Sequence, residues 1–247
     1  MLLRGYIDES YNADVFVWSC ILAQGNRWMG LEAAWKRCIA SENKRLVKLG
    51  RPAISRYHAS DCSSRRGEYK GWDTPDQIAF VKRLFAILKN YATYTVVWDV
   101  KISDVVQVFP EAKQDPLRAC YSILTKFMLD VLGQDIGKSR ITLIHDRNDY
   151  NLTILQAFDK MVNDPNFKYG KSFTSITACS WEDCIALQPA DLVAFEVFKR
   201  ASGYKRKSFD VLLDLGSFGI RSKRLPLDVL QKIKADLIKD GKIEDGA

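Results

Sequence analysis

The chain has 247 residues, of which 47% are hydrophobic and 27% are charged, and its formal net charge is +7 at pH 7. This is an ordinary globular composition, with enough chain for one large domain or for one domain that carries an inserted lobe. It argues against a membrane-spanning helix, because no apolar run approaches the roughly 18 residues of a span. The positive charge is compatible with a polyanionic partner such as nucleic acid.

Cysteines and the start of the chain indicate the compartment. Six cysteines are scattered without a CxxC pair, and only two histidines accompany them, so neither a zinc site nor a disulfide framework is supported. The first ten residues, MLLRGYIDES, indicate a strand and not a secretory signal, because Arg4 interrupts their brief apolar run. We expect reduced, mostly buried thiols in a cytoplasmic protein.

The chain opens with two strand patterns. Residues 2–10 are largely apolar up to two adjacent acids, and residues 15–23 are continuous, β-branched and aromatic. The polar residues 11–14 between them predict an antiparallel hairpin. A helix is expected at about 28–48, where apolar residues recur at helical spacing, and it is expected to end near Gly50.

Residues 51–72 form an irregular, basic stretch of the kind that is often functional or mobile. A helix follows, with Thr74 as its cap, Pro75 at the first helical position and apolar periodicity after it. Residues 92–100, ATYTVVWDV, then predict a strand.

The second half of the chain alternates helix and strand patterns. They predict a helix at 115–133 stopped at Gly133, a buried strand at 140–147 that ends on Asp146, a helix at about 150–162 capped by Asp149, a strand at 172–180, a helix from Gln188 with Pro189 as its first helical residue, and a helix near 227–239. This order predicts an α/β sheet protein with an initial antiparallel hairpin.

Three aspartates share one kind of position. Asp8 ends the first strand, Asp146 ends a later strand, and Asp191 lies in the first turn of a helix. Strand ends at one edge of an α/β sheet meet at a crevice, so these side chains are expected to converge. Two carboxylates about 4 Å apart repel by roughly 4 kcal/mol at an effective dielectric near 20. One or two Mg²⁺ or Mn²⁺ ions would neutralise them and bind the non-bridging oxygens of a phosphodiester.

Three stretches carry a resemblance to a known family: YIDES at 6–10, YHASD at 57–61 and LQPADLVAF at 187–195. In this order and spacing they resemble the domain-of-unknown-function 3800 family (DUF 3800). The resemblance implies a ribonuclease-H-like mixed sheet that opens with an antiparallel hairpin and is flanked by helices. It implies a domain at 1–204 with an inserted helix and loop at about 28–92, and a basic C-terminal extension at 205–247.

The resemblance also implies a metal-dependent nuclease site, with Asp8, Asp146 and Asp191 as catalytic metal ligands for Mg²⁺ or Mn²⁺. The chain departs from the family pattern at two positions. Tyr11 stands where Gly often follows the DES triplet, and Pro189 stands where Leu is usual. Neither departure removes a carboxylate.

The pair Asp8 and Glu9 poses a choice, because alternation along a strand sends neighbouring side chains to opposite faces. We expect only one of them to face the crevice, and the resemblance favours Asp8. Ribonuclease H itself presents a further glutamate from its first helix after the hairpin. Glu32 and Glu42 lie on the corresponding predicted helix, and Glu9 or Asp61 are alternatives for that role.

His58 is a further catalytic candidate, and two other polar residues, His145 and Gln188, lie near the predicted aspartates in the sequence. His58 lies in a polar loop, where it could act as a general acid, contact a phosphate or bond Asp61. His145 is expected to face away from the crevice by strand alternation. Gln188 could orient a ligand or bond the backbone. The positive end of the helix would favour an ionised Asp191 near the third helical position.

Basic residues in two regions could follow a nucleic-acid backbone, and the rings of Tyr57, Tyr69 and Trp72 could stack on bases. The basic residues are Arg51, Arg56, Arg65, Arg66 and Lys70 in the first region, and Lys205, Arg206, Lys207, Arg221, Lys223 and Arg224 in the second.

The sequence is compatible with three functional hypotheses. The leading hypothesis is a divalent-metal phosphodiesterase acting on RNA, DNA or a hybrid, which needs carboxylates and few other groups. A phosphatase with a nucleophilic aspartate is disfavoured, because its chemistry wants a second Asp where Ser10 stands. The third is a nucleic-acid-binding or assembly protein without turnover, of a bacterial defence or mobile-element system. The oligomeric state is left open.

Overall fold

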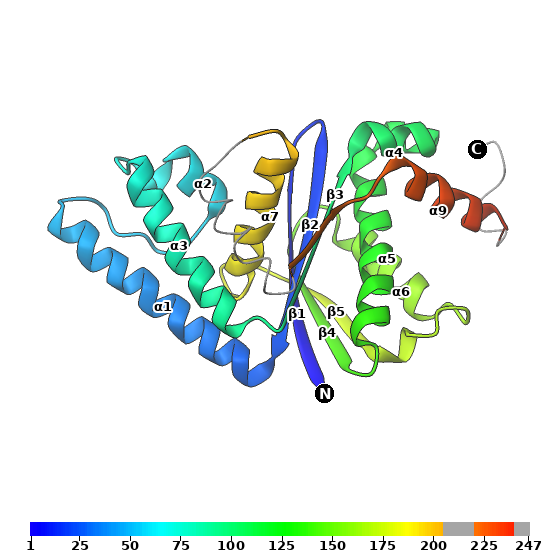
Figure 1. Cartoon of the computed structure of the whole chain (residues 1–247), viewed down its shortest axis with the longest axis horizontal. Helices are drawn as coiled ribbons and strands as arrows, with labels where there is room; N and C mark the ends of the chain where they lie inside the picture. The colour runs from blue at the N-terminus through cyan, green and yellow to red at the C-terminus, as the bar shows by residue number, and fades with distance from the viewer. Residues whose placement is uncertain (205–219, 240–247) are drawn as a thin grey trace.

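The computed structural model describes residues 1–204 and 220–239, so the predicted nucleic-acid contacts Lys205, Arg206 and Lys207 lie outside the described residues. The described part forms a six-stranded mixed sheet with helices on both faces (Figure 1). This confirms the α/β class. In sheet order the strands are β5 (Phe173–Cys179), β4 (Arg140–Asp146), β1 (Leu2–Tyr11), β2 (Val15–Gln24), β3 (Tyr94–Lys101) and β6 (Ile220–Arg224).

β1 and β2 form the predicted opening hairpin, with Tyr11 paired to Phe16 beside the turn. The side-chain oxygen of Asn12 closes the turn by accepting hydrogen bonds from the N–H groups of Asp14 and Val15, at 2.9 and 2.8 Å. β3 runs antiparallel to β2, whereas β4 is parallel to β1, β5 to β4 and β6 to β3. The parallel pairs need crossover connections, and helices supply them.

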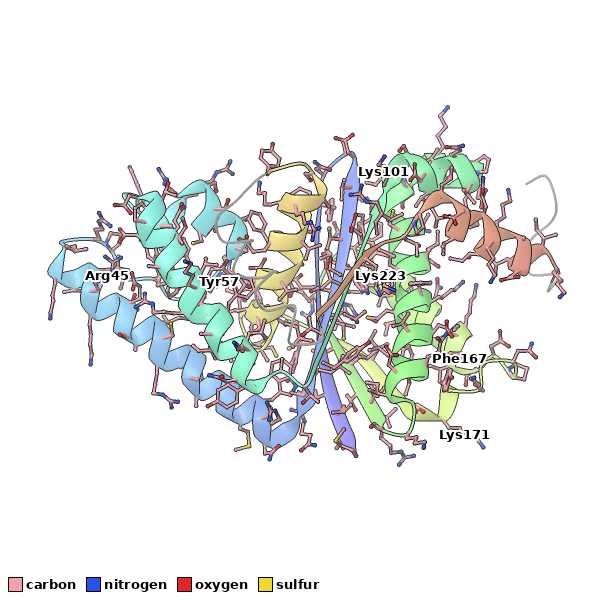
Figure 2. All side chains as sticks on the ribbon, in the orientation of Figure 1. Arg45, Tyr57, Lys101, Phe167, Lys171 and Lys223 are labelled. Atoms are coloured by element: carbon pink, nitrogen blue, oxygen red, sulfur yellow. The ribbon has the colours of Figure 1, made fainter. Side chains whose placement is uncertain are left out.

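Two helical layers bury the two faces of the sheet, and side chains fill the space between them (Figure 2). One layer contains α1 (Gly25–Lys48), α2 (Ala59–Ser64), α3 (Thr74–Tyr91) and α7 (Leu187–Ala201), and the other contains α4 (Ile102–Val108), α5 (Pro116–Ile136), α6 (Asn151–Val162) and α9 (Leu227–Lys239) (Figure 1). Short 3-10 helices lie at Gly67–Tyr69, Pro110–Gln114 and Gly170–Ser172. No helix among the described residues is both long and apolar enough to cross a membrane.

Two predicted helix ends are wrong for identifiable reasons. Asp73, not Thr74, caps α3, because its carboxylate accepts the N–H of Asp76 at 2.7 Å. α5 does not stop at Gly133 but continues to Ile136. The ring of Tyr169 packs against Gly133, and a Cβ there would lie 2.6 Å from it. The glycine therefore serves close packing and does not end the helix.

Two further predictions fail at helix starts. Asp149 does not cap α6, which Tyr150 precedes without a side-chain cap bond. α7 begins at Leu187, so Pro189 is its third residue and Asp191 its fifth. Pro189 is tolerated because its missing N–H falls among the first four, which have no partner within a helix. The expected benefit of the helix N-terminus for Asp191 is accordingly reduced.

Candidate active site

The three predicted aspartates line one cleft of about 270 Å³, just beyond the last pair of the β1–β4 ladder. They come from a strand of the hairpin, a crossover strand and α7, which are far apart in sequence. Asp146 ends β4 as predicted, but Asp8 does not end β1, which continues to Tyr11. The cleft is lined by Asp8, Glu9, Arg56, Tyr57, His58, Asp146, Trp181, Leu187, Gln188 and Asp191. A larger cavity of about 670 Å³ lies beside α5 and α6 and shares none of these residues.

Sheet register accounts for the proximity of Asp8 and Asp146. Ile7 pairs with His145 in the parallel ladder, so the two aspartates are the next residues on neighbouring strands. Ile7 packs in the core on the α5 side of the sheet and Ile144 against the core on the α7 side, so alternation turns both Asp8 and Asp146 toward α7. As predicted, His145 does not line the cleft; it is buried, and burial lowers its pKa.

α7 brings Asp191 to the same place because it packs across β1 and β2. The hydroxyl of Ser19 on β2 donates a hydrogen bond of 3.0 Å to the backbone oxygen of Ala190. This buried bond fixes the height of the helix on the sheet one residue before Asp191.

Each of the three carboxylates is held by backbone N–H groups through one oxygen. Asp8 accepts from Glu9 at 2.8 Å, and Asp191 accepts from Ala59 at 2.8 Å. Asp146 accepts from Arg147 at 2.9 Å and from Trp181 at 3.2 Å. The other oxygen of each carboxylate has no hydrogen bond to a described residue. One oxygen of each aspartate is therefore available to a ligand.

Burial and mutual repulsion make the ionised site costly. Burial raises the pKa of Asp8 well above its ordinary value, and the charges of Glu9, Asp191 and Asp146 raise it further. Burial also raises the pKa of Asp191 to about 6, against the opposing effects of the Ala59 N–H and of His58. Burial raises the pKa of Asp146 as well. A bound cation would relieve this repulsion.

Glu9 also lines the cleft, so the expectation that only one of the adjacent acids faces it is wrong. Alternation does turn Glu9 to the α5 side, but the β1–β4 ladder ends at Ile7 and His145, so beyond them β1 is not paired with β4 and both of its faces border the cleft. Asn148 donates a hydrogen bond of 3.1 Å to its Oε1. The Oε2 atom of Glu9 is buried and has no hydrogen-bond partner among the described residues. Burial raises the pKa of the Glu9 carboxyl to about 7.

Among the four candidates for a further acid, only Glu9 lies in the cleft. Asp61 binds His58, with 2.6 Å between Oδ2 and Nδ1. Glu42 is fully buried in ion pairs with Arg45 and Arg83 on the outer helices. Glu32 lines a neighbouring cavity.

Gln188 acts as a buried connector between three segments. Its side-chain oxygen accepts the indole N–H of Trp35 and the backbone N–H of Tyr57, each at 3.0 Å. These bonds join α1, the loop before His58 and α7. Of the two roles predicted for Gln188, the structure shows the backbone bond.

Gln188→Met is expected to lower the free energy of unfolding by about 2–6 kcal/mol, because it leaves two buried donors unpaired at about 1–3 kcal/mol each. Urea denaturation at constant pH measures the loss. Gln156→Met, on the exposed side of α6, is the matched control and should change stability by less than about 0.5 kcal/mol. Equal effects at the two positions would contradict the connector role.

The predicted nucleic-acid contacts separate into different environments. Arg56 lines the cleft, whereas Arg65, Arg66 and Lys70 are exposed and lie outside its lining. Two of the other basic residues are ion-paired, Arg51 with Asp76 and Arg224 with Asp99.

The predicted stacking of Tyr57, Tyr69 and Trp72 on bases is wrong, because all three are buried in the core between α3 and α7. Figure 2 shows Tyr57 between these helices. The aromatic residue that sequence reasoning missed is Trp181, which lines the cleft with 36% of its surface exposed. Its surroundings, SWEDC, carry no motif; the only available signal was an isolated tryptophan among acids.

The donor chemistry suits Mg²⁺ or Mn²⁺, because the available atoms are carboxylate oxygens. The geometry is open: within residues 1–204 and 220–239 no group of three His, Cys, Asp or Glu side chains is already arranged to hold a metal ion. Binding a cation would therefore require the carboxylates to draw together. The carboxylates can make this movement because backbone N–H groups hold only one oxygen of each.

Comparison with known proteins adds no assignment. No protein-family model matches the chain, and no curated protein matches it. The resemblance to the DUF 3800 family stays a prediction based on three short motifs.

Proposed function

We propose that the protein is a divalent-metal-dependent nuclease of ribonuclease-H-like type, which hydrolyses phosphodiester bonds of RNA, DNA or a hybrid. The observation that carries the proposal is the meeting of Asp8, Asp146 and Asp191 in one cleft. An aspartate on the first strand, one at the end of a middle strand and one on a late helix packed against the sheet form the arrangement that the ribonuclease-H-like resemblance implies.

In this proposal Asp8, Asp146 and Asp191 hold Mg²⁺ or Mn²⁺, with Glu9 as the additional acid. When bound, the metal activates water and neutralises charge on the phosphodiester. The chain itself orients the carboxylates through the N–H groups of Glu9, Ala59, Arg147 and Trp181.

Arg56 and His58 also line the cleft, and they are the groups suited to a phosphate. The guanidinium supplies a fixed positive charge to non-bridging oxygens. His58 bonds Asp61 through Nδ1, and its Nε2 lies 3.4 Å from the Ser60 hydroxyl. In this proposal Nε2 exchanges that long contact for the leaving oxygen and carries a proton to it.

The test is cleavage of labelled RNA, DNA and hybrid of one sequence during titration with Mg²⁺ and then Mn²⁺, with EDTA as the reference. The proposal predicts cleavage of at least one substrate that requires the cation and stops with EDTA. No cleavage of any substrate at any cation concentration would contradict it.

One observation favours a second candidate, a nucleic-acid-binding or assembly protein without turnover, of a bacterial defence or mobile-element system. It is the open arrangement of acids among the described residues, none of which already form a group of three suited to a metal. Binding of nucleic acid without cleavage, at a strength independent of divalent cation, would support this candidate over the nuclease.

A further inference from the structure

Trp181 is an unusual residue in this chain because it is exposed. The other five tryptophans expose no more than 6% of their surface, whereas Trp181 exposes 36%. It lies in the loop between β5 and α7, and its backbone N–H donates to Asp146 Oδ1 at 3.2 Å. An exposed indole is therefore fixed directly beside a predicted metal ligand.

Arg56 covers part of this indole. Its guanidinium carbon lies 3.1 Å from the ring centroid. Both residues line the acidic cleft and also the adjoining cavity of about 460 Å³, so the pair forms the wall between the two. The guanidinium of Arg56 and the indole of Trp181 are both planar and lie together, and each of them can stack on an aromatic ring of a ligand.

The charges around Trp181 indicate which part of a nucleic acid it would meet. Glu182 and Asp183 follow it in the loop, are exposed, and line the adjoining cavity. Together with Glu32 they outnumber the cations of that cavity, Lys36 and Arg56, so the sugar–phosphate backbone is disfavoured on the cavity side of the wall, whereas Arg56 can still face a phosphate in the cleft. A neutral base has no such penalty, and bases stack on aromatic side chains and on arginine planes.

We propose that Trp181 and Arg56 form a stacking platform for an unpaired base, so that the cleft takes single-stranded nucleic acid. The proposal rests on the proposed function, because it assumes that a phosphodiester reaches the neighbouring aspartates. In a duplex both faces of each base are already stacked within the helix, so only an unpaired base can use the platform. Stacking is tolerant of sequence, so the preference concerns strandedness.

Fluorescence anisotropy in EDTA tests the platform without cleavage. The probes are a labelled single strand and a hairpin-capped duplex of the same sequence. Trp181→Ala is expected to weaken binding of the single strand by roughly 5- to 100-fold. Trp181→Phe, which keeps a ring, should retain most of the affinity. Arg56→Lys, which keeps the charge and loses the plane, should fall between the wild type and Trp181→Ala.

Tryptophan emission supplies an independent readout that reports contact with the ring. Because the other tryptophans are buried, the quenching caused by the single strand should disappear in Trp181→Phe. The platform is refuted if the wild type binds no single strand, if Trp181→Ala binds it normally, or if duplex binding falls equally.

These results can be distinguished from a failure of the nuclease proposal. Binding of single strands through Trp181 without cation-dependent cleavage would keep the platform and refute the nuclease. Cation-dependent cleavage that is insensitive to Trp181→Ala would do the reverse.

Discussion

Asp8→Asn is expected to lower cation-dependent cleavage by roughly 100-fold or more, and Asp191→Asn is expected to do the same. Loss of a group that only supports a metal ligand costs about 10- to 100-fold, and loss of a ligand should cost at least as much. Asn matches Asp in shape, so the backbone contacts of the site remain available. Initial cleavage rates at saturating Mn²⁺ measure the effect.

Two controls separate loss of chemistry from loss of structure. In EDTA, Asp8→Asn should be at least as stable as the wild type, because it removes one of several buried, mutually repelling carboxylates. Asp149→Asn changes an exposed aspartate of the same HDRND stretch that does not line the cleft, and it should cleave normally. Cleavage that persists in both Asp8→Asn and Asp191→Asn would exclude the proposed site.

Stability of the metal-free protein is expected to fall as pH rises from about 4 to 7. The pKa of Asp191 is raised to about 6 and that of Glu9 to about 7, from ordinary values of 3.8 and 4.5. Between these values the folded state keeps protons that the unfolded chain has released, so a rise in pH favours unfolding. Each of the two shifts corresponds to about 3 kcal/mol, since one pKa unit is about 1.4 kcal/mol, so the expected loss is between roughly 3 and 6 kcal/mol.

Mn²⁺ should reverse this trend, because the cation binds the ionised carboxylates and the unfolded chain does not hold them together. A cation at about 100 times its Kd adds roughly 2.7 kcal/mol. The gain should be large at pH 7.5 and small at pH 5, where protons compete. Urea denaturation across this range, with EDTA or Mn²⁺, measures both effects.

Glu9→Gln identifies the groups responsible for the pH dependence. It should flatten the fall in stability between pH 5 and 7 in EDTA, because it removes a buried group whose pKa is about 7. His145, whose pKa is lowered by burial, works in the opposite direction and is unchanged in this variant. A pH profile identical to that of the wild type would contradict the assignment.

Features that depend on local pattern could be predicted from the sequence. The alternation and turn chemistry around Asn12 suffice to predict the opening hairpin, and acids late in two strand patterns suffice to place Asp8 beside Asp146. In both cases short-range periodicity and sheet geometry determine the outcome. Asp191 joins Asp8 and Asp146 only through the packing of α7 on the sheet.

Features that depend on tertiary contacts could not be predicted. Gly133 looks like a helix end, but the ring of Tyr169 determines its role. Glu9 reaches the cleft because β1 extends beyond its pairing with β4, which alternation alone does not reveal. The basic loop around Trp72 suggests an exposed ring, but Trp72 is buried in the core. The exposed tryptophan is Trp181.

Anomalous diffraction from crystals soaked in Mn²⁺ tests the central claim most directly. The account predicts a manganese peak in the cleft, within about 2.5 Å of a carboxylate oxygen of each of Asp8, Asp146 and Asp191. It also predicts that the peak disappears in Asp8→Asn crystals. A fully soaked wild-type crystal with no peak between these aspartates, or with manganese bound only elsewhere, would contradict the account.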